Sequence, residues 1–97
     1  MDEHLQRLRR WMGRATMRQF YTELQAHLPT DEYELELEGD TLTVFHLEKR
    51  RGFLGLGARQ VRRPCLQVIH HSDRIEVPEE CADPAFVALL AEMLRLR

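Results

Sequence analysis

The sequence predicts an α+β fold in the order α-β-β-β-β-α, with a four-stranded antiparallel meander between an N-terminal and a C-terminal helix. Apolar residues recur at helical spacing near both ends of the chain, residues 33–38 alternate apolar with acidic, and turn residues separate the middle segments. Both helices are expected to pack on one face of the sheet. With 97 residues, 1–97 should form a single domain around one core.

Composition indicates a packed, soluble protein. Hydrophobic residues make up 43% of the chain and charged residues 31%, which fits neither a disordered nor a membrane protein. The longest apolar run, Ala85–Ala91, is far shorter than the roughly 20 residues that span a bilayer. The N-terminus lacks the apolar stretch of a secretory signal, and two cysteines are too few for a disulfide framework. A cytoplasmic location is therefore expected.

The first helix is expected to run from about Glu3 to His27. Its apolar residues form two helical stripes, and the stripe shifts near Gly13, where a bend is expected because glycine costs roughly 1 kcal/mol in a helix interior. Pro29 ends the element. The stripes consist of Leu5, Leu8, Met12 and Ala15, and then of Met17, Phe20, Leu24 and Leu28.

The next two strands are predicted to form a hairpin around the turn Gly39-Asp40. Alternation from Tyr33 to Glu38 gives the first strand one apolar and one acidic face. If both strands flank the turn directly, the cross-strand pairs on the core side are Leu37 with Leu42, Leu35 with Val44, and Tyr33 with His46.

The remaining elements follow from their boundary residues. A third strand is expected at about Gln60–His71, and a bulge or unpaired position is expected at Pro64, which cannot donate to the ladder. A short fourth strand is predicted at Arg74–Val77. The last helix should begin at Asp83-Pro84, because a carboxylate caps the helix and proline is best tolerated at the first helical position.

These registers divide the apolar residues between two faces of the sheet. The predicted core consists of Leu35, Leu37, Leu42, Val44, Leu66, Val68, Ile75 and Val77 against Phe20, Leu24, Phe86, Leu90 and Met93. The opposite face would carry Phe45, Leu47, Val61, Cys65 and Ile69. Because a monomer seldom leaves such a surface wet, we expect either a symmetric homodimer through that face or a helix behind it.

Charge is segregated along the chain. Residues 49–63 contain six basic residues and no acidic one, whereas Asp31–Asp40 contains six acidic residues and no basic one. The predicted anion or nucleic-acid ligands are Lys49, Arg50, Arg51, Arg59, Arg62 and Arg63, with Phe53 available to stack on a base. Binding through these residues should be weak and should fall steeply with salt. The alternative is that the arginines pair with Glu34, Glu36 and Glu38.

Known catalytic and metal-binding patterns are not met. Gly52, Gly55 and Gly57 precede a strand instead of the helix that a Walker loop requires, so a hairpin loop whose apolar residues plug the core is favoured. Cys65, His70, His71 and Cys81 fit no paired zinc spacing, and Cys65 and Cys81 are expected to lie close together as free thiols. The sequence therefore predicts no cofactor, no metal and no enzymatic activity.

The segment Lys49–Arg59, which reads KRRGFLGLGAR and precedes a predicted strand, resembles the hairpin motif of the N-terminal domain of Jag-type proteins. Those are bacterial RNA-binding proteins, and the match covers little more than a tenth of the chain. The resemblance implies a similarly shaped basic hairpin. We expect a small non-catalytic module that contacts RNA or single-stranded DNA. The alternative is a homo-oligomeric or chaperone-like interaction domain that uses the outer face of the sheet.

Overall fold

The computed structural model describes residues 3–51, 58–72 and 74–95, with the backbone alone for 49–51 and 58–60. Within these ranges it holds three α-helices, a turn of 3-10 helix and a four-stranded antiparallel sheet of order β1-β2-β3-β4, which confirms the predicted α+β class and order. The elements are α1 (Glu3–Met12), α2 (Met17–His27), β1 (Tyr33–Glu38), β2 (Thr41–Arg51), β3 (Ala58–His70), β4 (Ile75–Glu76), η2 (Glu79–Cys81) and α3 (Pro84–Met93).

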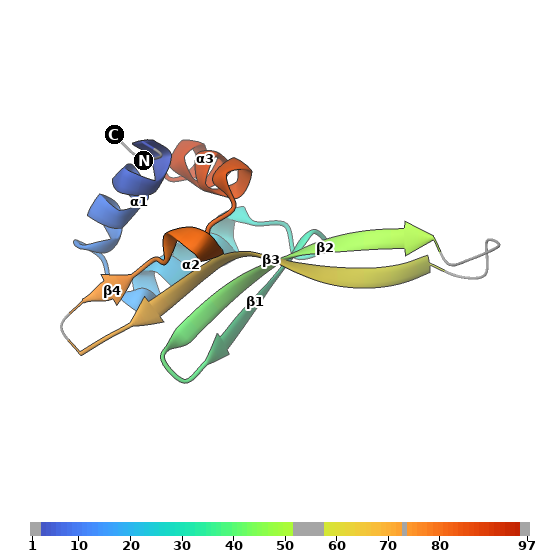
Figure 1. The fold of residues 1–97 in the computed structure, drawn as a ribbon, viewed down its shortest axis with the longest axis horizontal. Helices are drawn as coiled ribbons and strands as arrows, with labels where there is room; N and C mark the ends of the chain where they lie inside the picture. Colours follow the sequence, from blue (N-terminus) through green and yellow to red (C-terminus); the bar gives the residue numbers. More distant parts are fainter. Residues whose placement is uncertain (1–2, 52–57, 73, 96–97) are drawn as a thin grey trace.

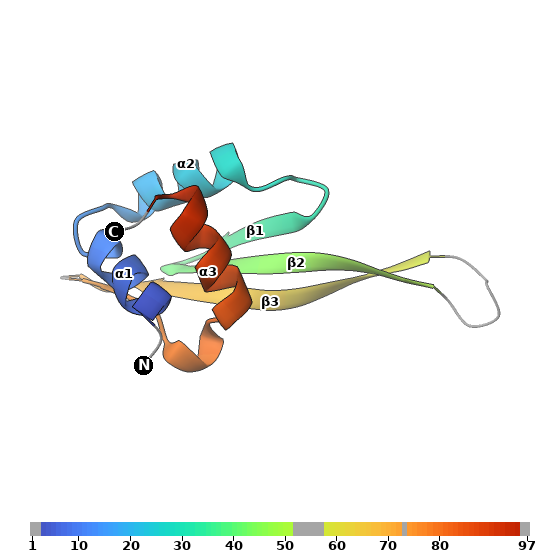
Figure 2. The same ribbon diagram turned by 90° about the horizontal axis from the view of Figure 1, so that it is seen from above.

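The helices gather on one side of the sheet, as predicted for the two ends of the chain. Figure 1 shows α1 and α3 above the strands, and Figure 2, which looks down on this side, shows α3 crossing over β2 and β3 while α2 lies along β1. We call the opposite side of the sheet the outer face. No helix of the described residues covers it (Figure 1).

The first hairpin has the predicted register. Its pairs include Tyr33 with His46, Leu35 with Val44, and Leu37 with Leu42. Gly39 in the turn has a φ of +58°, a left-handed conformation that glycine adopts without a steric penalty.

A β-bulge interrupts the pairing of β2 and β3 beside Pro64. Val44 pairs with Leu66, but the next residue of β2, Phe45, pairs with Pro64, so Cys65 is the extra residue. Because a bulge sets two residues opposite one, Cys65 joins Leu66 in the core, and it is only 2% exposed. The prediction that Cys65 lies on the outer face is therefore wrong.

For the β3 residues that precede the bulge in the sequence, the pairing with β2 is shifted by one residue. Val61 pairs with Glu48 and Arg62 pairs with Leu47. Paired residues share a face, so Val61 lies on the helical side with Glu48, and its predicted place on the outer face is also wrong. Phe45, Leu47 and Ile69 keep their predicted register on the outer face, where each is half-buried.

The N-terminal helix is two helices instead of one bent helix. Between α1 and α2, Thr16 has extended backbone angles and forms a capping box with Gln19. The Thr16 hydroxyl accepts the Gln19 backbone N–H at 3.1 Å, and the Gln19 side chain accepts the Thr16 backbone N–H at 2.8 Å. This reciprocal cap starts a new helix, so the bend expected at Gly13 becomes a complete break.

The core lies between the sheet and the helices and largely follows the prediction. Of the predicted members, Phe20, Leu24, Leu42, Val44, Leu66, Val68, Val77, Phe86 and Leu90 are buried, and Leu35, Ile75 and Met93 pack partly buried against them. Leu5, Leu8 and Met12 of α1 are buried in the same core. Leu37 was expected in the core, but it is 55% exposed. It lies on the edge strand next to a turn that projects away from the helices (Figure 1), so no helix covers it.

Candidate nucleic-acid interface

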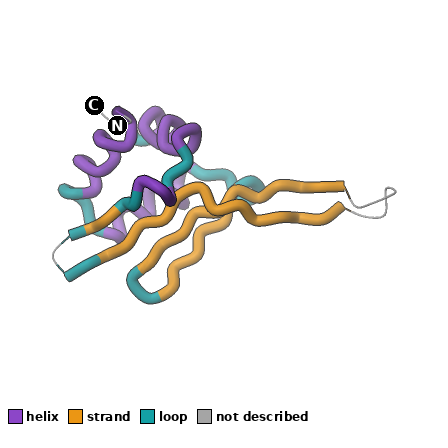
Figure 3. The backbone as a smooth tube through the Cα atoms, in the orientation of Figure 1, coloured by secondary structure: helices purple, strands orange, loops and turns teal. Residues whose placement is uncertain are grey.

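The central hairpin extends beyond the rest of the sheet as a two-stranded ribbon, formed by Glu48–Arg51 of β2 and Ala58–Val61 of β3 (Figure 3). The first residue of β1, Tyr33, pairs with His46, so β1 does not extend alongside the ribbon. β4 pairs only with Ile69 and His70, at the other end of β3. Among the described residues, the ribbon therefore has no third strand on either edge. We call this segment the basic ribbon.

Four of the predicted ligand residues lie in the basic ribbon. Lys49, Arg50 and Arg51 follow one another on β2, and Arg59 of β3 pairs directly with Arg50. The side chains of these four residues lie outside the described part of the structure, as does the whole of Phe53.

Arg62 lies at the root of the ribbon, and its side chain contacts residues of β1 and β2 on the outer face. Its guanidinium stands 4.5 Å from the centre of the Phe45 ring. The same group lies 3.3 Å from a Glu34 carboxylate oxygen and 3.7 Å from one of Glu36. The arginine thus covers an aromatic ring of β2 and bridges to two carboxylates of β1, which is the alternative that the sequence left open.

Arg63, on the helical side, ties the ribbon to α3. Its Nε lies 3.0 Å from a carboxylate oxygen of Glu48, and one of its terminal guanidinium nitrogens lies 3.6 Å from a carboxylate oxygen of Asp83. Asp83 caps α3 by accepting the backbone N–H of Ala85 at 3.0 Å, and its own backbone N–H donates to the carbonyl of Cys65 at 2.8 Å. Arg63 therefore joins the bulge, the helix cap and the ribbon.

The six predicted basic ligands thus fall into two groups. Arg62 and Arg63 have carboxylate partners within the chain, so their charge is largely balanced before any ligand binds. Lys49, Arg50, Arg51 and Arg59 lie further along the ribbon. The anchoring roles of Glu48 and Asp83 were missed from the sequence, because they depend on the one-residue shift at the bulge.

A cluster of chemically active residue types lies beside α3. The Tyr33 ring packs 5.1 Å from that of His46, and Tyr33, His46, Arg63, Cys65 and Asp83 line a small cavity of about 140 Å³. Burial raises the pKa of the Cys65 thiol to about 12, with Asp83 adding to the shift and Arg63 opposing it. The thiol also lies 3.3 Å from the carbonyl oxygen of Val44. A thiol with this pKa stays protonated at neutral pH and is a poor nucleophile.

Among the described residues, no group of three His, Cys, Asp or Glu side chains could hold a metal ion. Cys65 and Cys81 are both free thiols. None of the described helices is long and apolar enough to cross a bilayer.

Comparison with known proteins gives no relative for this chain. No protein-family model, curated protein sequence or solved structure matches it.

Proposed function

We propose that the protein is a small non-catalytic binding module whose basic ribbon contacts the phosphate backbone of RNA or single-stranded DNA. The observation that carries this proposal is the ribbon itself, which extends past the sheet and sets Arg50 opposite Arg59 next to Lys49 and Arg51. The local resemblance of Lys49–Arg59 to the Jag-type hairpin also supports it.

The physical basis of binding is electrostatic. Lysine and arginine on a narrow ribbon can approach a phosphate backbone from either face, and arginine can form two parallel hydrogen bonds to one phosphate. Such contacts read the backbone and not the bases, so affinity should depend little on sequence and strongly on salt. Arg62 and Arg63 would hold the root of the ribbon in place instead of binding the ligand.

Charge reversal in the ribbon tests this proposal. Changing Arg50, Arg51 and Arg59 to Glu should abolish binding of a labelled single-stranded RNA at low salt, measured by fluorescence anisotropy. The matched control changes three exposed arginines elsewhere, at Arg10, Arg18 and Arg74, to Glu. The control carries the same net charge and should retain most of the binding. If the wild type does not bind, or if both variants lose binding equally, the proposal is wrong.

A second function, self-association or chaperone-like protein binding through the outer face, is supported by a separate observation. Phe45, Leu47 and Ile69 lie on the side of the sheet that no described helix covers. Sedimentation over a range of concentrations tests it, with Leu47→Glu as the variant that should prevent assembly. A wild type that remains monomeric at every concentration would exclude the homodimer.

A further inference from the structure

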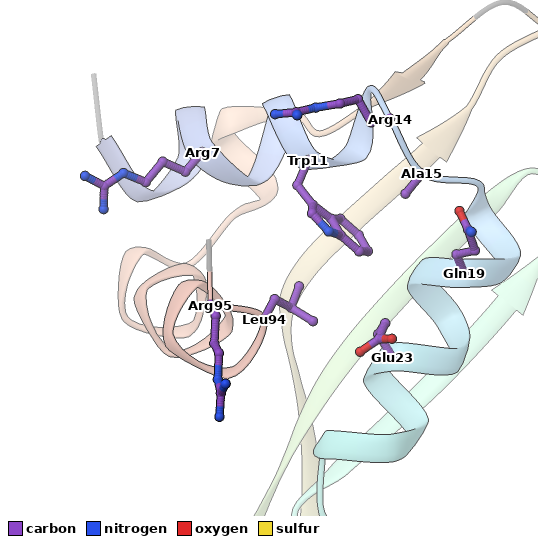
Figure 4. Close-up of a pocket in the computed structure, with 8 residues that line it drawn as sticks. All are labelled: Arg7, Trp11, Arg14, Ala15, Gln19, Glu23, Leu94 and Arg95. Atoms are coloured by element: carbon purple, nitrogen blue, oxygen red, sulfur yellow. The ribbon is translucent and has the colours of Figure 1, made fainter. Parts of the chain in front are cut away.

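A cleft of about 510 Å³ lies on the helical side, where α1, α2 and the end of α3 meet. This volume is within the usual range for small-molecule sites. In Figure 4, Trp11 of α1 and Leu94 after α3 point toward each other, and Gln19 and Glu23 of α2 face them from the opposite wall. The cleft therefore combines a flat aromatic side chain with polar groups.

Trp11 is held in a fixed position and still lines the cleft. Its ring packs against that of Phe20, with centroids 5.8 Å apart and an angle of 60° between the planes. Because Phe20 is fully buried, this contact fixes the indole from the core side. Trp11 itself is only half-buried, so part of the indole remains available to a planar ligand.

The charges around the cleft favour an anion. Arg7, Arg14 and Arg95 line it together with a single acid, Glu23. Arg7 pairs with Glu3, and Glu23 lies 3.3 Å from His27. Neither Arg14 nor Arg95 has a side-chain ion pair or hydrogen bond among the described residues, which leaves two positive charges without a partner there.

The polar wall offers both a donor and an acceptor. The Gln19 side-chain oxygen is fixed by the Thr16 backbone N–H at 2.8 Å, which leaves the amide NH₂ free to donate. Glu23 supplies an acceptor near it (Figure 4). The edge of a nucleobase carries donors and acceptors together, whereas an acidic peptide would bring its carboxylates close to Glu23.

The backbone at Arg95 is a further unusual feature. Its φ is +51°, which is a left-handed backbone conformation. At the position after a helix C-cap, this conformation is usually adopted by glycine. An arginine in this position costs stability, and such costs tend to persist where a side chain has a function.

We propose that this cleft binds a nucleoside phosphate, with the base against Trp11, its edge on Gln19 and Glu23, and the phosphate at the rim of the cleft. The exposed side chains of Arg14 and Arg95 would reach this phosphate by turning inward from the positions in Figure 4. The ligand is either a free nucleotide or one nucleotide of a single strand. The site is separate from the basic ribbon and does not depend on the function proposed for it.

Trp11 is the only tryptophan in the chain, so its fluorescence reports directly on the cleft. Adenosine and cytidine monophosphates and a short single-stranded RNA should each be titrated against the intact protein. Saturable quenching by a mononucleotide identifies a free-nucleotide site, whereas quenching by RNA alone identifies a site for a nucleotide within a strand. No saturable quenching by any of these, or equal binding of inorganic phosphate or a glutamate-rich peptide, overturns the proposal.

Paired variants separate the cleft from general charge and from the ribbon. The double variant Arg14→Gln, Arg95→Gln should bind about tenfold or more weakly, since both charge-assisted hydrogen bonds are lost. The matched variant Arg10→Gln, Arg18→Gln removes two exposed arginines that do not line the cleft, and it should bind like the wild type. Mononucleotide quenching should also survive the charge reversal of the ribbon. Equal losses in the two double variants would contradict the assignment.

Discussion

The guanidinium of Arg62 lies 4.5 Å from the centre of the Phe45 ring, on the face of the sheet that carries no described helix. This contact shields part of an aromatic ring from water and places a positive charge beside Glu34 and Glu36. Arg62 therefore supports the sheet at the root of the ribbon, although it belongs to the same basic run as the proposed ligands.

Arg62→Ala should lower the free energy of unfolding by about 0.5–1 kcal/mol, because an exposed ion pair and an exposed cation–π contact each contribute little. Thermal unfolding followed by circular dichroism would measure the loss. The same variant should weaken RNA binding less than Arg50→Ala does. A larger effect of Arg62→Ala on binding would place Arg62 among the ligand contacts.

Leu90→Ala should lower the free energy of unfolding by roughly 2–5 kcal/mol, because a fully buried leucine leaves a cavity when it is truncated. Leu89→Ala, next to it on α3, is the matched control, since Leu89 is 38% exposed. Denaturant unfolding of both variants compares the two sites. Equal losses would contradict the packing of α3 described above.

Much of the fold could be predicted because the signals were local. The alternation of Tyr33–Glu38 and the turn Gly39-Asp40 fix both register and face, and Asp83-Pro84 marks the start of α3. Even the bulge beside Pro64 was expected, because proline lacks the N–H that a ladder needs.

The errors came from the non-local consequences of local features. Pro64 could leave one position unpaired in a continuous register, or an extra residue beside it could shift the register by one, and the sequence does not decide between the two. That choice sets the face of every β3 residue before the bulge, and Cys65 and Val61 were misplaced for this reason. Leu37 has the predicted partner, Leu42, and so the predicted face of the sheet. It is nevertheless exposed, because exposure depends on how far the helices extend over that face. The cleft at Trp11 depends on how three helices meet, which no periodicity shows.

The protein should lose stability in alkaline solution. The Cys65 thiol, whose ordinary pKa is 9.0, stays protonated in the folded chain up to about pH 12. In the unfolded chain it ionises above about pH 9, so its stabilising contribution is complete below that pH and is lost as the pH rises toward 12. Burial also raises the pKa of Tyr33 above its ordinary value, and the sign of its effect is the same.

Denaturant unfolding between pH 8 and pH 11 would measure this dependence. Cys65→Ala should flatten the decline of the unfolding free energy with pH, while Cys81→Ala should keep the slope of the wild type. A Cys65→Ala slope equal to that of the wild type would show that the buried thiol does not contribute.

Arg95→Gly should leave stability unchanged or raise it by up to about 1 kcal/mol, because glycine adopts the left-handed conformation at this position without a steric penalty. The same variant should weaken nucleotide binding in the cleft, since it removes a guanidinium. Thermal unfolding and Trp11 fluorescence measure the two effects on one sample. A variant that binds nucleotide as the wild type does would remove Arg95 from the site.

The salt dependence of RNA binding tests the central claim most directly. If Lys49, Arg50, Arg51 and Arg59 each contact a phosphate of a single strand, log Kd should change with log salt by about 0.7 per contact, or about 2.8 in total. Affinity would then fall roughly 50-fold between about 50 and 200 mM salt, and Arg50→Ala would reduce the slope by about 0.7. A slope near zero, or one unaffected by Arg50→Ala, would contradict a backbone contact through the basic ribbon.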